Sequence, residues 1–216
     1  MKSRLVGMLL VSLVCIFATA SGHAQTMHPM GSEMIMTKPA VELEMTMRKL
    51  WEDHIEYTRN FIISALAGSD DAGKVAERLL KNQDDIGDAI KPLYGAQAGM
   101  KLSELLRDHI LIAADVVNAA KSGSAGELEA ASKKWYVNAD DIAVFLSGAN
   151  PNWIRAEMSE MLHKHLEYTT QEVVSRLKRD WVGDIEAYDK GHSHMLMFAD
   201  MLTRGIVIQF PDRFKS

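Results

Sequence analysis

An internal repeat of about 55 residues constrains the fold of this chain more than any other feature of its sequence. His54, His109 and His165 each follow a similar apolar segment, and they are spaced by 109 − 54 = 55 and 165 − 109 = 56 residues. Asn82 and Asn138 form a second matched pair, 138 − 82 = 56 residues apart. Since each copy is long enough for two helices and a turn, the repeat predicts three helical hairpins.

The spacing of apolar residues predicts helix along nearly the whole chain. Apolar residues recur three and four positions apart, and the alternation typical of strands is absent. Short connections make neighbouring helices antiparallel. We therefore expect an all-α fold, a single bundle of about six helices arranged as three antiparallel hairpins. The expected helices lie near residues 39–67, 71–91, 97–121, 125–147, 154–178 and 181–208.

The N-terminus has the pattern of a secretory signal peptide. Lys2 and Arg4 precede an apolar run, and small residues end the segment at Ala24. The sequence thus predicts a signal peptide over 1–24, a flexible tail rich in Met and His over 25–38, and a helical bundle domain over 39–216. We expect a periplasmic or secreted protein that contacts a membrane only through the signal peptide, if that segment stays uncleaved.

Composition excludes several classes of function. The only cysteine, Cys15, lies in the predicted signal peptide, so the mature chain has no disulfide, no thiolate zinc site and no c-type haem. The net charge of −5 and the lack of a basic cluster argue against nucleic acid as a partner. No Gly-rich phosphate loop is present, which argues against a nucleotide cofactor. Oligomer formation is left open.

The helical periodicity directs several polar side chains toward the core. His54, His109 and His165 share helix faces with apolar residues three, four and seven positions away. Asn82 and Asn138 also lie on apolar faces. The remaining inward candidates are His192, which shares a face with Ile185 and Tyr188, and Asp85 and Asp141, one turn after the two asparagines.

A buried polar layer of this kind has three interpretations. An unpaired buried polar group costs about 1–3 kcal/mol, so these side chains either bond to one another or bind a ligand. The first interpretation is a metal site, for copper or zinc, and the second is a scaffold or interaction module whose polar layer is structural. The third is a small enzyme that uses a His-Asp pair. The predicted metal ligands are His54, His109, His165, His192, Asp85 and Asp141.

Methionine supplies a second possible site. Met27-His28-Pro29-Met30 and Met34 lie in the predicted tail, and thioether ligands suit Cu(I). The sequence therefore leaves two candidate sites for a metal ion or small ligand, one in the bundle core and one in the tail.

The segment Leu50-Trp51-Glu52-Asp53-His54-Ile55-Glu56-Tyr57-Thr58-Arg59, together with residues 82–94, 135–146 and 199–206, resembles a family of exported bacterial helical proteins whose function is unassigned. The resemblance covers about residues 47–211. It implies an all-helical fold and an exported protein, and it transfers no catalytic residue.

Overall fold

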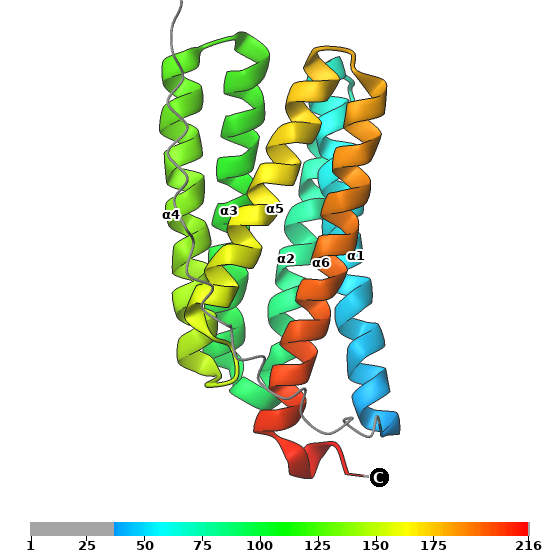
Figure 1. Cartoon of the computed structure of the whole chain (residues 1–216), viewed down its shortest axis with the longest axis vertical. Helices are drawn as coiled ribbons and strands as arrows, with labels where there is room; N and C mark the ends of the chain where they lie inside the picture. Colours follow the sequence, from blue (N-terminus) through cyan, green and yellow to red (C-terminus); the bar gives the residue numbers. More distant parts are fainter. Residues whose placement is uncertain (1–36, 216) are drawn as a thin grey trace, which may run out of the picture. The chain divides into compact units, whose positions relative to one another are not determined.

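The computed structural model describes residues 37–215, which form six α-helices and a short 3-10 helix (Figure 1). This confirms the all-α fold, and each helix lies close to its predicted range. The predicted signal peptide and nearly all of the predicted tail fall outside the described residues. The helices are α1 (Lys38–Ala67), α2 (Ala72–Tyr94), α3 (Ala96–Ser122), α4 (Ala125–Ala149), α5 (Arg155–Leu177) and α6 (Trp181–Gln209), and the 3-10 helix is η1 (Pro211–Arg213).

Local sequence signals set the ends of the helices. The Thr37 side chain accepts a hydrogen bond from the backbone N–H of Ala40 and caps α1, and Pro39 occupies the first turn, where its missing N–H has no intrahelical role. Gly68 and Gly123 end α1 and α3 with φ values of 69° and 73°, the left-handed conformation that glycine adopts without steric cost. These turns reverse the chain within a few residues.

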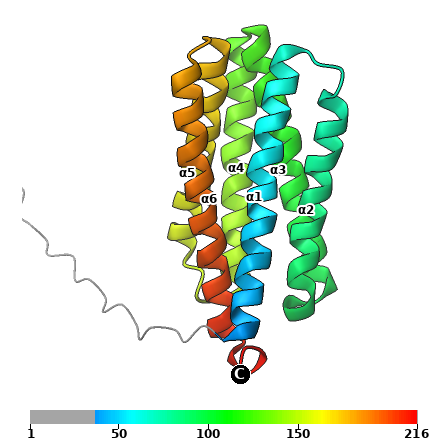
Figure 2. The same ribbon diagram turned by 90° about the vertical axis from the view of Figure 1, so that its right-hand side faces the viewer.

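The helices form a closed arrangement of three hairpins. Each helix packs antiparallel against the next in the chain, and α6 packs against α1 (Figures 1 and 2). The odd-numbered helices also contact one another across the bundle, α1 with α3 and α3 with α5. The first helix of every hairpin therefore faces the interior, and these are the helices that carry His54, His109 and His165.

Aromatic residues and close helix contacts hold the bundle together. Trp51 of α1 packs edge-on against Phe198 of α6, with ring centroids 5.0 Å apart. α2 and α3 approach each other closely at Gly87 and Gly99, because a Cβ atom on Gly87 would lie 2.5 Å from the carbonyl oxygen of Gly99. Within residues 37–215, no helix is long and apolar enough to cross a membrane.

Candidate functional site

Three imidazole rings meet in the middle of the bundle, one from each hairpin. His54, His109 and His165 are each only 2% exposed. Their ring centroids are 5.5 Å apart for His54 and His165, 5.9 Å for His109 and His165, and 6.4 Å for His54 and His109. The prediction that these three histidines face the core is confirmed. We call these three side chains the histidine triad.

Burial keeps the histidine triad uncharged at neutral pH. Removal from water lowers the pKa of His54 to about 3 and that of His109 to about 4. The pKa of His165 lies well below its ordinary value, because of burial first and the neighbouring imidazoles second. Each ring therefore has one N–H and one nitrogen with a lone pair.

A carboxamide fixes the orientation of His109. Asn138 on α4 donates a hydrogen bond from Nδ2 to the carbonyl oxygen of Leu105, at 3.1 Å, so its Oδ1 must face the histidine. That oxygen lies 2.8 Å from Nδ1 of His109. Since an amide oxygen only accepts, this network assigns the proton of His109 to Nδ1 and the lone pair to Nε2.

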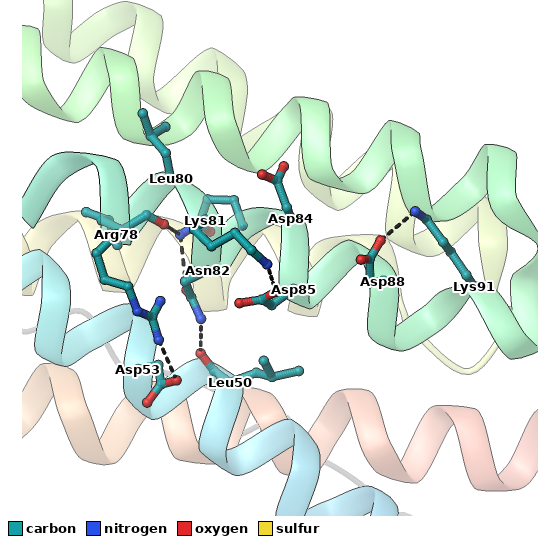
Figure 3. Close-up of polar contacts among 12 residues, drawn as sticks. Leu50, Asp53, Arg78, Leu80, Lys81, Asn82, Asp84, Asp85, Asp88 and Lys91 are labelled. Carbon is teal, nitrogen blue, oxygen red and sulfur yellow. Dashed lines mark hydrogen bonds and ion pairs between the residues drawn. The ribbon is translucent and has the colours of Figure 1, made fainter. Parts of the chain in front are cut away.

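In the first hairpin, Asn82 and Gln83 together make the two contacts that Asn138 makes alone in the second. Asn82 donates from Nδ2 to the carbonyl oxygen of Leu50, at 2.9 Å (Figure 3). Gln83 donates from Nε2 to the carbonyl oxygen of Leu79, at 2.8 Å, and its Oε1 lies 3.3 Å from Nδ1 of His54. His54 therefore has the same tautomer as His109, with the lone pair on Nε2.

The third hairpin has a histidine in place of the carboxamide. Gln83 and Asn138 each lie 29 residues after the histidine that they contact, and His194 lies 194 − 165 = 29 residues after His165. His194 is 8% exposed, and its Nε2 donates to the carbonyl oxygen of Met161 at 2.8 Å, as Asn138 donates to Leu105. The sequence analysis missed this residue: the 29-residue offset from His109 to Asn138 points to position 194, but the 28-residue offset from His54 to Asn82 points to 193.

His165 differs from the other two members of the triad at Nδ1. Its Nδ1 is buried and has no hydrogen-bond partner within residues 37–215. An unpaired polar atom in a dry core is unfavourable by about 1–3 kcal/mol, so such atoms in native proteins require an explanation. A ligand or a rearrangement that gives Nδ1 of His165 a hydrogen-bond partner would therefore stabilise the third hairpin.

Three of the six predicted ligands do not join the triad. His192 is half-buried and its Nε2 lies 3.2 Å from Oε1 of Glu52, because the buried face of α6 includes Gly191, His194 and Phe198 instead. The prediction that His192 points into the core is wrong. Ile185, which supported it, is 53% exposed.

The two aspartates also lie away from the interior, so the expectation that they face the core with Asn82 and Asn138 is wrong. Asp85 is partly exposed and pairs with Lys81 four residues earlier, as Figure 3 shows. Asp141 is exposed and lines a surface groove between α3 and α4. Three positions along a helix correspond to a rotation of about 300°, so a residue one turn after a buried one readily falls at the edge of the buried face.

The described part of the chain contains no ready-made metal site, and this includes the histidine triad as it stands. Among residues 37–215, no group of three or more His, Cys, Asp or Glu side chains has the arrangement of a metal site. A His-Asp pair lies on the surface, where Nε2 of His163 is 2.9 Å from Oδ1 of Asp140. Ser159 donates to the same Asp140 oxygen, at 2.6 Å, rather than to the histidine that would activate it as a nucleophile.

Comparisons of the chain with protein-family models, with curated protein sequences and with solved structures find no match. The structure supports the resemblance noted from the sequence only at the level of an all-helical protein with six helices.

Proposed function

We propose that the protein binds one divalent zinc or copper ion in the core of its helical bundle, between His54, His109 and His165. The observation that carries the proposal is the meeting of three buried, uncharged imidazoles, each from an equivalent position of one hairpin. Imidazole is a common ligand of both metals, and it binds them in its neutral form. The lowered pKa values of these histidines keep them in that form at neutral pH.

The carboxamide partners favour the same function. Imidazoles that bind a metal through one nitrogen usually donate a hydrogen bond from the other, which fixes the tautomer and the ring orientation. Gln83 and Asn138 accept in this way from Nδ1 of His54 and His109 and leave the lone pair on Nε2. Two of the three rings are therefore already in the protonation state of a ligand.

The spacing of the triad is close to that of a three-imidazole metal site. Three imidazoles around one ion have ring centroids about 5–5.5 Å apart, given metal–nitrogen bonds of about 2.0–2.1 Å. The triad has centroid distances of 5.5, 5.9 and 6.4 Å. The wider pairs therefore need to approach by about 1 Å or less, together with rotation of the rings.

The sequence pattern of a signal peptide supports a site outside the cytoplasm, where we propose that the protein carries or buffers the metal without enzymatic turnover. Because the triad is almost fully buried, the ion enters as the chain folds or when the bundle opens. Loading and release are then slow, and the bound ion stabilises the fold.

A titration with Co(II), a coloured substitute for Zn(II), tests the proposal. Because entry into the folded core is slow, the full mature chain is freed of metal in urea and refolded with increasing Co(II). We expect it to develop the visible absorption of a tetrahedral complex at about one ion per chain. His165→Ala removes a ligand and should weaken binding at least about 100-fold, since loss of an outer hydrogen-bond partner alone costs about 10- to 100-fold. Excess Zn(II) should abolish the absorption.

The matched control is His163→Ala. His163 lies on the same helix, two residues away, and its side chain is 35% exposed on the outer face. We expect this variant to bind Co(II) as the unaltered protein does. Circular dichroism establishes that both variants fold. Equal binding by the two variants would contradict the assignment, and absence of binding by the unaltered protein would favour the scaffold interpretation.

The tail requires a separate measurement because thioethers favour Cu(I) and the triad favours divalent ions. Cu(I) and Zn(II) are titrated into a chain that lacks residues 25–36. If this truncation removes Cu(I) binding and leaves Zn(II) binding intact, the two sites are distinct. If it removes Zn(II) binding, the triad is not the zinc site.

A further inference from the structure

A small apolar cavity lies one helical turn away from the histidine triad. Its volume is about 20 Å³, and its lining includes Thr58, Ala113 and Thr169. Each of these residues lies four positions, about one helical turn, after a histidine of the triad. The cavity therefore lies about one turn further along the three inner helices, on their C-terminal side, and the imidazoles themselves do not line it.

The cavity wall is almost entirely apolar. Ile62, Val116 and Val117 contribute aliphatic surface. The hydroxyl groups of Thr58 and Thr169 donate to the carbonyl oxygens of His54 and His165, at 2.7 and 3.0 Å, so their protons are directed to the backbone. At these two positions the wall thus presents methyl groups in place of free hydroxyls.

One buried polar group of the wall remains without a partner. The Trp135 side chain lines the cavity, and its ring centroid is 5.3 Å from that of His109. Trp135 is 3% exposed, and its Nε1–H has no acceptor within residues 37–215. An indole N–H donates and cannot accept. Apart from the hydroxyl of Thr170, an exposed residue of the lining, a molecule in this cavity therefore meets apolar surface and the one unused donor of Trp135 among the described residues.

The volume of the cavity and the apolar character of its wall together limit the kind of molecule that it can bind. A space of about 10–15 Å³ on this measure holds one water, but an ordered water needs two to four polar partners. An ordered water molecule is therefore poorly stabilised in this cavity. For a small uncharged apolar molecule, transfer from water to this apolar surface is favourable. We propose that the cavity binds an uncharged gas of two or so heavy atoms, of the class of dioxygen, one helical turn from the histidine triad.

Gas binding in this cavity does not depend on a bound metal, so it is tested on the metal-free protein. The probes are xenon under pressure and dissolved dioxygen, and the readout is the methyl resonances of a uniformly labelled chain. We expect saturable xenon-induced shifts and enhanced relaxation by dioxygen at Ile62, Val116 and Val117. Val144 and Val182, which are 44% and 68% exposed, should respond weakly and without saturation.

Two alanine substitutions locate the binding. Ala113→Val places extra methyl groups in the cavity and should eliminate the saturable shifts. Ala130→Val makes the same exchange on the exposed side of α4 and should leave them unchanged. If Ala113→Val does not fold, Val117→Ile fills part of the same space and should weaken xenon binding.

The outcomes separate this inference from the proposed metal function. Absence of saturable shifts in the unaltered protein would overturn the gas-binding proposal, as would retention of full shifts in a folded Ala113→Val protein. Neither result bears on the Co(II) titration. Conversely, saturable shifts in a protein that binds no metal would support the gas-binding proposal and contradict the metal-binding proposal.

Discussion

Lowering the pH from about 6.5 to about 4 is expected to destabilise the metal-free protein by about 3 kcal/mol through each of His54 and His109. Their pKa values in the folded state are about 3 and about 4, against 6.5 when unfolded, so the unfolded chain binds protons first. The stability that they contribute is present above pH 6.5 and is lost as the pH falls. His165 acts in the same direction.

This loss is large compared with the stability of an ordinary domain, about 5–15 kcal/mol, so we expect the metal-free protein to unfold in mild acid. Urea unfolding at a series of pH values between 7 and 4 measures the effect. A free energy of unfolding that stays constant over this range would show that the triad is not buried in its neutral form.

Glu172 has the opposite pH dependence and provides the control. It is 5% exposed, and burial raises its pKa to about 7, although Nη1 of Arg59 donates to its Oε1 at 2.7 Å. Because its folded pKa exceeds its unfolded value, its contribution to stability is complete below about pH 4.5 and is lost as the pH rises through 7. Glu172→Gln removes this contribution and should steepen the acid unfolding that the histidines cause.

Saturation with Zn(II) is expected to raise the melting temperature by about 10 °C. A ligand at 1,000 times its Kd stabilises the folded state by about 4 kcal/mol. In a domain of this size, each kcal/mol shifts the melting temperature by about 2–4 °C. Differential scanning calorimetry with and without Zn(II) at pH 7 measures the shift.

The same pair of histidine variants gives the comparison for this effect. His165→Ala should lose most of the rise, and His163→Ala should keep it. A rise of equal size in both variants would place the stabilising ion elsewhere. This readout differs from the Co(II) titration because it reports on the folded state as a whole rather than on the colour of the complex.

The repeat and the helical periodicity were sufficient to predict the fold. The repeat predicts three hairpins, and the spacing of apolar residues places every helix end within a few residues of its observed position. The burial of the histidine triad also followed from the sequence, because each of these residues lies within a continuous apolar stripe on its helix. Local pattern and tertiary packing agree at these positions.

The partners of the triad were harder to predict for a physical reason. A face assignment has an uncertainty of about one residue in either direction, and on α6 the exposed Ile185 drew the predicted face toward His192 and away from His194. The hydrogen bond between Gln83 and His54 depends on the relative axial position of two helices, which periodicity within one helix does not specify.

Metal content measures the central claim most directly. The mature protein is purified without metal-affinity resin and without refolding, and the metals per chain are counted by mass spectrometry. We predict about one zinc or copper ion per chain, reduced at least about tenfold in His165→Ala and unchanged in His163→Ala. A metal-free protein that also fails to take up Zn(II) during folding would contradict the account, and so would full metal content in His165→Ala.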